Sequence, residues 1–219
     1  LKDIIFLFKK RDHHSKGLFS VSYFYNKNYK NYRAKQLKRI TNSRTIHDLE
    51  KIKNINYIFF IFSRSWIVLT NYSKFYQNQI EVIRNICLQL PSKYKLLVKE
   101  HPRNIGRRSQ GYYKKILEIP NVDFADFELP SIEVLKNSKL VIVLSGNIGY
   151  EAVLNKVPVI TLGNTMYNML PSHMVNHLDS IKNIYTEIDN TINIYRWDVN
   201  IFKKYIAAII KNSFSLDLY

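Results

Sequence analysis

The sequence predicts an α/β fold in which helices cover both faces of a parallel β-sheet. Short apolar runs of strand length alternate along the chain with segments whose apolar residues recur at helical spacing. Each run is almost continuously apolar, which indicates strands buried on both faces of a sheet. The chain has 219 residues, 46% of them hydrophobic, and this is enough to build a substantial core. Alternation of this kind is typical of layered α/β domains.

Five segments have the composition and length of buried strands. In chain order they are 56–62 (NYIFFIF), 94–100 (YKLLVKE), 121–125 (NVDFA), 139–145 (KLVIVLS) and 158–163 (PVITLG). The predicted helices between them span 76–90, 110–119, 130–138 and 147–155. Pro91 ends the first of these helices, and Pro130 starts the third. We therefore predict a Rossmann-like domain over residues 56–219, preceded by a separate basic segment at 1–55.

The chain is strongly basic. A net charge of +16 predicts attraction to a polyanion such as a nucleic acid, a phosphorylated small molecule or an anionic membrane face. Much of this charge lies in residues 25–54, where tyrosines are interleaved with Lys and Arg, a pattern compatible with stacking on single-stranded nucleic acid. We favour a solvated, partly helical face, with an anionic membrane rather than nucleic acid as its partner.

Composition also bears on the compartment. No segment approaches the roughly 20 consecutive apolar residues that span a bilayer. The first residues, LKDIIFLFKK, include no initiator Met and do not resemble a signal peptide, so we expect the chain to begin inside a longer protein. A single cysteine, Cys87, excludes an intramolecular disulfide and fits a reducing compartment. We expect a cytoplasmic protein, at the periphery of the inner membrane.

Polar loops follow three of the predicted strands. Ligands bind in such folds beyond the carboxyl ends of the strands. Lys99, Glu100, His101, Pro102 and Arg103 lie where the strand 94–100 runs out into a loop, with Arg107 and Arg108 further along. The strand 139–145 runs out into a loop at Ser145, Gly146 and Asn147, and the strand 158–163 does so at Gly163 and Asn164. We predict that these three strand ends are adjacent and form one site.

The segment SGNIGYEA has the chemistry of an anion site. Gly146 and Gly149 allow the backbone to approach a ligand closely, and a helix that begins near Asn147 directs its free N–H groups at an anion. A phosphate fits this arrangement. A simpler interpretation is a turn that only packs a helix against the sheet.

Other candidate residues have equally simple interpretations. A histidine after a strand is often structural, and the arginines near His101 fit phosphate but also a solvated loop. His173 and His177 are four residues apart, at the spacing of one helix face, and we interpret them as structural because no H-E-x-x-H motif accompanies them. We predict no metal site. Ser145 lacks the G-x-S-x-G context of a hydrolase nucleophile.

A resemblance to a known family rests on a series of motifs. They are K-E-H-P, G-x-R, P-N-V, S-G-x-x-G-x-E-A and P-V-I, all within residues 57–171, with a weaker echo at 204–214. This series resembles bacterial capsular polysaccharide biosynthesis proteins, which are similar to the capsule glycosyltransferases that include Kdo transferases. The resemblance implies a GT-B architecture of two Rossmann-like domains, with this chain as the C-terminal, donor-binding half and 1–55 as a remnant of the N-terminal domain.

The resemblance also implies roles for matching residues. His101 and Pro102 match the His-Pro motif that contacts the donor nucleotide and its phosphate. Ser145, Gly146 and Asn147 match the loop that holds the phosphate, although the family more often has Gly-Thr than Gly-Asn. Glu151, or alternatively Glu133, matches an acidic position suited to ribose hydroxyls, and the simpler interpretation of each is a surface helix residue. The implied reaction transfers a sugar from a nucleotide-sugar donor, such as CMP-Kdo, to a glycan or glycolipid acceptor, with no metal or cofactor.

Two departures from the family pattern affect these expectations. FSRSWIVL at 62–69 replaces the usual Pro-Leu-His and Pro-Glu pattern, so part of the donor or acceptor face is altered. The general base of a GT-B enzyme normally comes from the N-terminal domain, so this chain alone is expected to bind a donor without turning it over. A UDP-sugar 2-epimerase on the same fold and a non-catalytic nucleic-acid-binding protein remain as alternatives.

Overall fold

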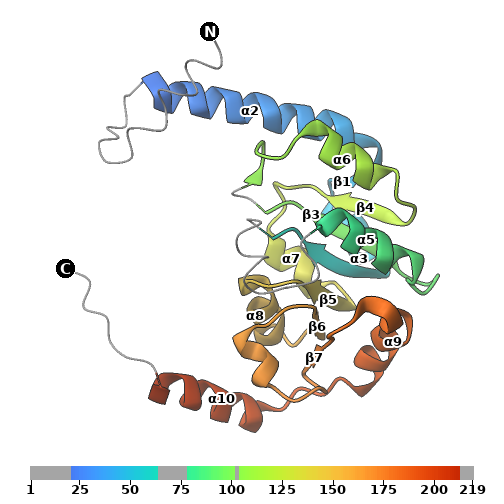
Figure 1. The fold of residues 1–219 in the computed structure, drawn as a ribbon, viewed down its shortest axis with the longest axis vertical. Coiled ribbons are helices and arrows are strands. Elements are labelled where there is room, and N and C mark those ends of the chain that lie inside the picture. The colour runs from blue at the N-terminus through green and yellow to red at the C-terminus, as the bar shows by residue number, and fades with distance from the viewer. Residues whose placement is uncertain (1–20, 64–77, 102–103, 213–219) are drawn as a thin grey trace.

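The computed structural model describes residues 21–63, 78–101 and 104–212. They form a seven-stranded, entirely parallel sheet with helices on both faces (Figure 1). The strands are β1 Thr45–Ile46, β2 Tyr57–Ile61, β3 Lys95–Lys99, β4 Val122–Ala125, β5 Leu140–Val143, β6 Val159–Thr161 and β7 Val175–His177. Their spatial order is β1-β4-β3-β2-β5-β6-β7. The predicted Rossmann-like fold is confirmed, and all five predicted strands are present.

Helices separate the strands in sequence. The α-helices are α2 Val21–Thr41, α3 Leu49–Lys53, α5 Gln79–Leu88, α6 Gln110–Leu117, α7 Ser131–Lys136, α8 Asn147–Leu154, α9 Ile184–Ile194 and α10 Val199–Asn212. Short 3-10 turns are η1 Asn42–Arg44, η3 Met166–Met169 and η4 Ile181–Asn183. The four helices predicted between strands correspond to α5, α6, α7 and α8, each within a few residues of its expected bounds.

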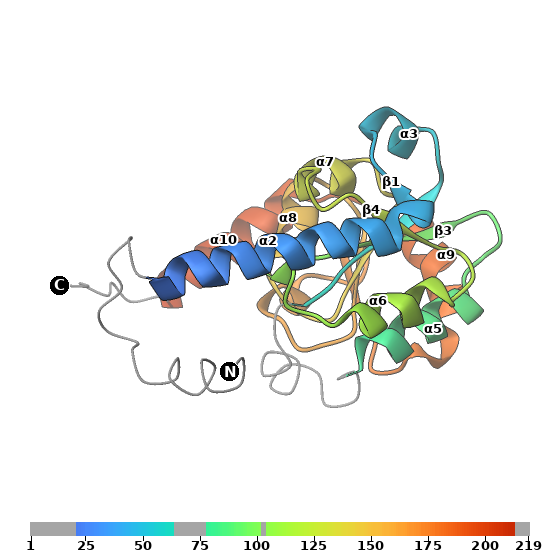
Figure 2. The same ribbon diagram turned by 90° about the horizontal axis from the view of Figure 1, so that it is seen from above.

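The core has two layers, one on each face of the sheet. Because successive side chains of a strand point to opposite faces, β2 contributes Ile58 and Phe60 to one layer and Tyr57 and Phe59 to the other. Helices α2, α5, α6 and α9 cover the first face, and α3, α7, α8 and α10 cover the second (Figure 2). The four side chains of β2 named above are fully buried, as expected for a strand that is covered on both faces.

The sheet extends beyond the predicted domain at its N-terminal side. Thr45 and Ile46 pair with Phe124 and Ala125 as the edge strand β1. In addition, α2 lies against α6, and Leu37 is part of the core. Part of the segment 1–55 therefore belongs to the same body as the sheet, although its basic residues predicted a separate region.

One short strand was not predicted. His173 and His177 have the spacing of one helix face and were interpreted as structural, and the structure places His177 in β7 rather than in a helix. The Nδ1 atom of His177 is 3.0 Å from the hydroxyl of Thr161 on β6. The short edge strand was missed because its buried Asn176 interrupts the apolar pattern, and the Asn176 amide is satisfied by donating to Thr191 at 2.9 Å.

Candidate functional site

The chain reverses its direction across the sheet beside β2. From this central strand the chain adds β3 and β4 on one side, and then returns to add β5, β6 and β7 on the other. Such a reversal leaves a crevice at the carboxyl ends of the strands, between β2 and β5, where folds of this type bind ligands. The candidate site lies at this crevice.

The order of the strands corrects one expectation. The ends of β3, β5 and β6 were predicted to be adjacent, but β2 lies between β3 and β5. Neighbouring strands are about 4.8 Å apart, so the two loops start about 10 Å from one another. Ser63, just after β2, stands between them. A ligand that contacts both loops must therefore be longer than a single phosphate group.

Lys99, at the end of β3, is directed toward the neighbouring strand. Its side chain is fully buried, and its Nζ donates to the carbonyls of Asp126 at 3.2 Å and Phe127 at 2.9 Å, just after β4. Burial lowers the pKa of Lys99 to about 8. Its ammonium group thus ties the ends of two strands together, a role that competes with the predicted contact to a donor.

Glu100 is at the centre of a buried hydrogen-bond network. Its Oε1 accepts from the backbone N–H of His101 at 2.8 Å, and its Oε2 accepts from Arg108 Nε at 2.9 Å and from Tyr113 Oη at 2.7 Å. Glu100 is only 3% exposed. Burial raises the pKa of Glu100, while Arg108, Tyr113 and the His101 N–H oppose that shift. Glu100 was predicted to bind the donor, and in the structure its carboxylate is buried and accepts these three hydrogen bonds.

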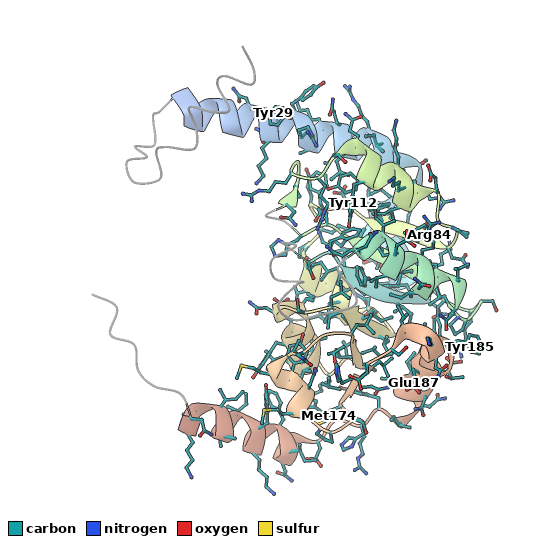
Figure 3. All side chains as sticks on the ribbon, in the orientation of Figure 1. Tyr29, Arg84, Tyr112, Met174, Tyr185 and Glu187 are labelled. Atoms are coloured by element: carbon teal, nitrogen blue, oxygen red, sulfur yellow. The ribbon has the colours of Figure 1, made fainter. Side chains whose placement is uncertain are left out.

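Arg108 connects this network to the end of β2. Its Nη2 donates to the carbonyl of Ser63 at 2.7 Å. The guanidinium lies over the rings of Phe62 and Tyr112, at 5.4 and 4.7 Å from their centroids. Tyr112 is carried by α6 (Figure 3). Arg108 is therefore an internal cation, held between two aromatic rings and a buried carboxylate.

The other predicted residues of this loop differ in their exposure. His101 is half-buried, and its carbonyl accepts from the backbone N–H of Asn104 at 2.8 Å. Arg107 is exposed. Pro102 and Arg103 lie outside the described residues. Of the predicted residues near β3 that the structure describes, Lys99 and Glu100 are buried, whereas His101 and Arg107 are at least partly accessible.

The loop after β5 has a different chemistry. Ser145 is 7% exposed, and its buried Oγ has no hydrogen-bond partner among the described residues. Gly146 follows with φ at 107°, a conformation that only glycine adopts readily, and a side chain there would point into open space. No side chain caps α8, which begins at the exposed Asn147. Because the first N–H groups of a helix lack internal partners, this end presents donors to an anion.

Gly149 has a structural reason to be glycine. A Cβ atom at this position would lie 2.4 Å from the hydroxyl oxygen of Tyr167. That hydroxyl donates to the carbonyl of Gly146 at 2.9 Å. The absent side chain of Gly149 therefore makes room for Tyr167, which supports the turn before α8, whereas the sequence suggested that it gives a ligand access.

The two candidate glutamates differ in environment. Glu151 is half-buried on α8, and burial raises the pKa of its carboxyl. Glu133 is on α7, where it is 3.1 Å from Lys136 and close enough to affect Lys53 on α3. Glu133 thus interacts with lysines of α7 and α3, whereas Glu151 is on the helix whose start forms part of the candidate site. Glu151 is the better placed of the two.

Sequence reasoning did not assign site roles to several residues that shape this edge. They are Ser63, Arg108, Tyr113 and Tyr167. Arg108 was noted only as one of a group of arginines, and nothing in the local pattern distinguishes it from Arg107. A signal for Tyr167 existed in Gly149, since a glycine inside a helix often marks close packing.

Solved structures share this fold at low sequence identity. A UDP-GlcNAc 2-epimerase from Methanocaldococcus jannaschii matches with a TM-score of 0.51 and 17% identity, over 81% of this chain and 50% of that one. The beta Kdo 2,7 transferase KpsC of Thermosulfurimonas dismutans matches with a TM-score of 0.46 and 13% identity, over 71% of this chain and 51% of that one. The S. aureus MnaA structure with UDP matches with a TM-score of 0.48 and 13% identity, over 78% and 51%. The chain thus spans about half the length of these proteins.

The sequence itself identifies the family. No curated protein matches this chain. A family profile, described as Capsule polysaccharide biosynthesis protein, matches residues 7–194 of the 219. The match includes both loops of the candidate site, as well as the segment before the predicted domain. This chain belongs to the capsule polysaccharide biosynthesis protein family.

Proposed function

We propose that this chain is the donor-binding half of a glycosyltransferase that builds a capsular polysaccharide from a nucleotide-sugar. The proposal rests on its family and on one feature of the site, the uncapped start of α8 beside the buried, unpartnered hydroxyl of Ser145. A buried hydroxyl without a partner is costly, so a ligand oxygen that bonds to it is favoured. An anionic phosphate suits both the hydroxyl and the helix N–H groups.

The proposed reaction places the donor across the crevice. Its phosphate lies at Ser145, Gly146 and Asn147, and the rest of the molecule extends toward His101, because the two loops are too far apart for one phosphate to reach both. As the glycosidic bond to the phosphate breaks, negative charge grows on the leaving oxygen. The N–H groups of α8 and the imidazole of His101 stabilise that charge, in the manner of an oxyanion site. This scheme uses no metal or cofactor. A CMP-sugar is the donor we favour, with a glycan or glycolipid as acceptor.

Calorimetry with purified chain tests the donor site. The ligands are CMP, UDP, GDP and a single-stranded RNA. We expect one nucleotide to bind, and His101→Ala to weaken it by roughly 1.5–3 kcal/mol because a hydrogen bond to a charged group is lost. His47→Ala is the matched control. His47 directly follows the edge strand β1 and pairs with Asp126 at 2.6 Å, so its loss should leave nucleotide affinity unchanged. Equal losses in both variants, or binding of RNA alone, would reject the donor site.

The same protein distinguishes a transferase from a 2-epimerase. Both enzymes bind a nucleotide-sugar, but only the epimerase converts a UDP-sugar when no acceptor is present. We expect the NMR spectrum of a UDP-sugar to stay unchanged in the presence of this chain. Appearance of the C2 epimer would replace the transferase proposal by the epimerase.

We also propose that α2 contacts an anionic membrane face. None of the described helices is long and apolar enough to span a bilayer. Tyr32, Lys35 and Arg39 recur at helical spacing and are exposed. Tyrosine and basic side chains together suit the headgroup region of an anionic membrane. A stripe of this kind fits a surface contact.

Vesicles that contain anionic lipid test this contact. Replacing Lys35 and Arg39 by Gln should weaken binding about 30-fold, at about 1 kcal/mol per charge, and lower its salt dependence. Lys38→Gln is the control, since Lys38 is already 2.7 Å from Glu128 and over the ring of Phe127. Nucleotide affinity should stay constant in all of these variants. Equal losses of nucleotide and vesicle binding would count against separate sites.

A further inference from the structure

The buried Glu100 directly precedes His101, the proposed donor contact. It accepts three hydrogen bonds, and one of them comes from the backbone N–H of His101 itself. The other two donors, Arg108 and Tyr113, lie in the following loop and on α6. The backbone of His101 is thus fixed to a group that is held from two further directions.

The network extends to the central strand of the crevice. Arg108 donates to the carbonyl of Ser63, and Asn104 Nδ2 is 3.4 Å from the same oxygen. Ser63 immediately follows the end of the β2 pairing, between the β3 and β5 loops. Through Arg108, the carboxylate of Glu100 therefore connects the backbone of His101 to the end of β2, beside the crevice.

The loop is also supported from outside. Arg33 on α2 donates through Nη2 to the carbonyl of Arg108. Gly106 has φ at 75°, and a Cβ there would be 2.7 Å from the carbonyl oxygen of Lys30. Helix α2 thus packs closely over residues 106–108. Residues 106–108 are therefore held by Glu100 on the inner side and by α2 on the outer side.

We infer that Glu100 is a positioning residue, which sets the orientation of His101 at the donor through its hydrogen bonds to the His101 N–H, Arg108 and Tyr113. The inference rests on the proposed function, in which His101 contacts the donor. In this role Glu100 acts through His101 rather than by contacting the ligand, because its carboxylate is buried and accepts from Arg108, Tyr113 and the His101 N–H. A site residue needs this kind of support, since its geometry depends on the groups that hold it.

Calorimetry of Glu100→Gln with CMP and UDP tests the inference. The Gln amide keeps the size of the side chain, but its NH2 group cannot accept, so at least one of the hydrogen bonds from His101, Arg108 and Tyr113 is lost. We expect nucleotide affinity to fall about tenfold in this variant, and to fall by less than about twofold when the same change is made in His101→Ala. Glu81→Gln is the matched control, since Glu81 is an exposed carboxylate that pairs with Arg84 at 3.5 Å on α5.

A second background separates positioning from a general loss of stability. In Ser145→Ala, Glu100→Gln should still cost about tenfold, because Ser145 belongs to the other loop. Tyr113→Phe removes a single donor to Glu100 Oε2 and keeps the packed ring, so it applies if Glu100→Gln does not fold. We expect a loss of about threefold that again disappears in His101→Ala.

The results separate this inference from the proposed function. If His101→Ala weakens binding but Glu100→Gln and Tyr113→Phe do not, the inference is overturned and the donor site stands. Equal losses from Glu100→Gln in the wild-type and His101→Ala backgrounds would also overturn it, because they indicate a merely structural role. If His101→Ala itself leaves the affinity for both nucleotides unchanged, or neither nucleotide binds the wild-type chain, the donor site and the inference are rejected together.

Discussion

The two loops at the crevice are built in opposite ways. The loop after β3 is held by charged and polar side chains that satisfy one another, with Glu100, Arg108 and Tyr113 all engaged. The loop after β5 is built of small residues. Gly146 is open to solvent, and the hydroxyl of Ser145 has no partner among the described residues. This loop is supported by Tyr167 of η3, whose hydroxyl donates to the carbonyl of Gly146.

This difference shows how a single site divides its tasks. A loop whose side chains are already paired places a functional group, here His101, at a defined position. A loop of small residues leaves backbone N–H groups free for an anion that approaches closely. Polar residues near a strand end are thus of two kinds, and burial together with hydrogen bonds identifies those, such as Glu100, that support the site.

The largest expected effect comes from breaking the β3 side. Arg108→Met keeps most of the packing against Phe62 and Tyr112 but leaves the carboxylate of Glu100 buried without its cation. We expect the free energy of unfolding to fall by about 3 kcal/mol. Arg84→Met, which removes an exposed pair with Glu81, should cost less than about 0.5 kcal/mol. Urea titration of both variants measures the difference, and comparable small losses would show that the Glu100 network contributes little to stability.

A glycine comparison tests the support beneath the β5 side. Gly149→Ala places a methyl group against the Tyr167 ring and should lower the free energy of unfolding by about 1–3 kcal/mol. Gly111→Ala, near the start of α6, meets no atom within 4 Å and should raise stability by up to about 1 kcal/mol through helix propensity. Thermal and urea unfolding should thus give opposite signs. A neutral Gly149→Ala would mean that Tyr167 moves aside at no cost.

Lys99, at the end of β3, makes the free energy of unfolding dependent on pH. Burial lowers its pKa to about 8, below the roughly 10.4 of an unfolded lysine. Between these values the unfolded chain binds a proton that the folded chain lacks, so this group adds stability as the pH rises. The unfolding free energy of wild type relative to Lys99→Met should increase between about pH 8 and 10, by at most about 1.4 kcal/mol per unit. A difference that does not change over this range would exclude a depressed lysine pKa.

The smallest expected effect on stability is at Ser145. Ser145→Ala removes a hydroxyl that has no partner in the described part of the chain, so the free energy of unfolding should stay constant or rise by up to about 1 kcal/mol, while nucleotide affinity falls. Ser138→Ala removes a buried hydroxyl that donates to the Leu135 carbonyl at 2.7 Å, and it should cost about 1 kcal/mol. If Ser145→Ala destabilises as much as Ser138→Ala, its hydroxyl serves the fold rather than a ligand.

The fold could be predicted because its signals are local. Runs such as YIFFI at 57–61 and LVIV at 140–143 are apolar at every position, and burial on both faces of a parallel sheet is the packing that such runs require. Helices between them follow from helical spacing and from prolines at their ends. The short edge strands β1 and β7 were missed, because two or three residues with polar neighbours contain no periodicity to detect.

Within the site, the sequence determined which residues come after the strands, and therefore that His101 and Ser145 lie on one edge of the sheet. Strand order, which comes from the path of the whole chain, inserted β2 between their loops. Only the tertiary structure separated Arg107 from Arg108. Adjacent arginines are alike in sequence, and it is the buried Glu100 with the rings of Phe62 and Tyr112 that makes one of them internal while the other stays in solvent.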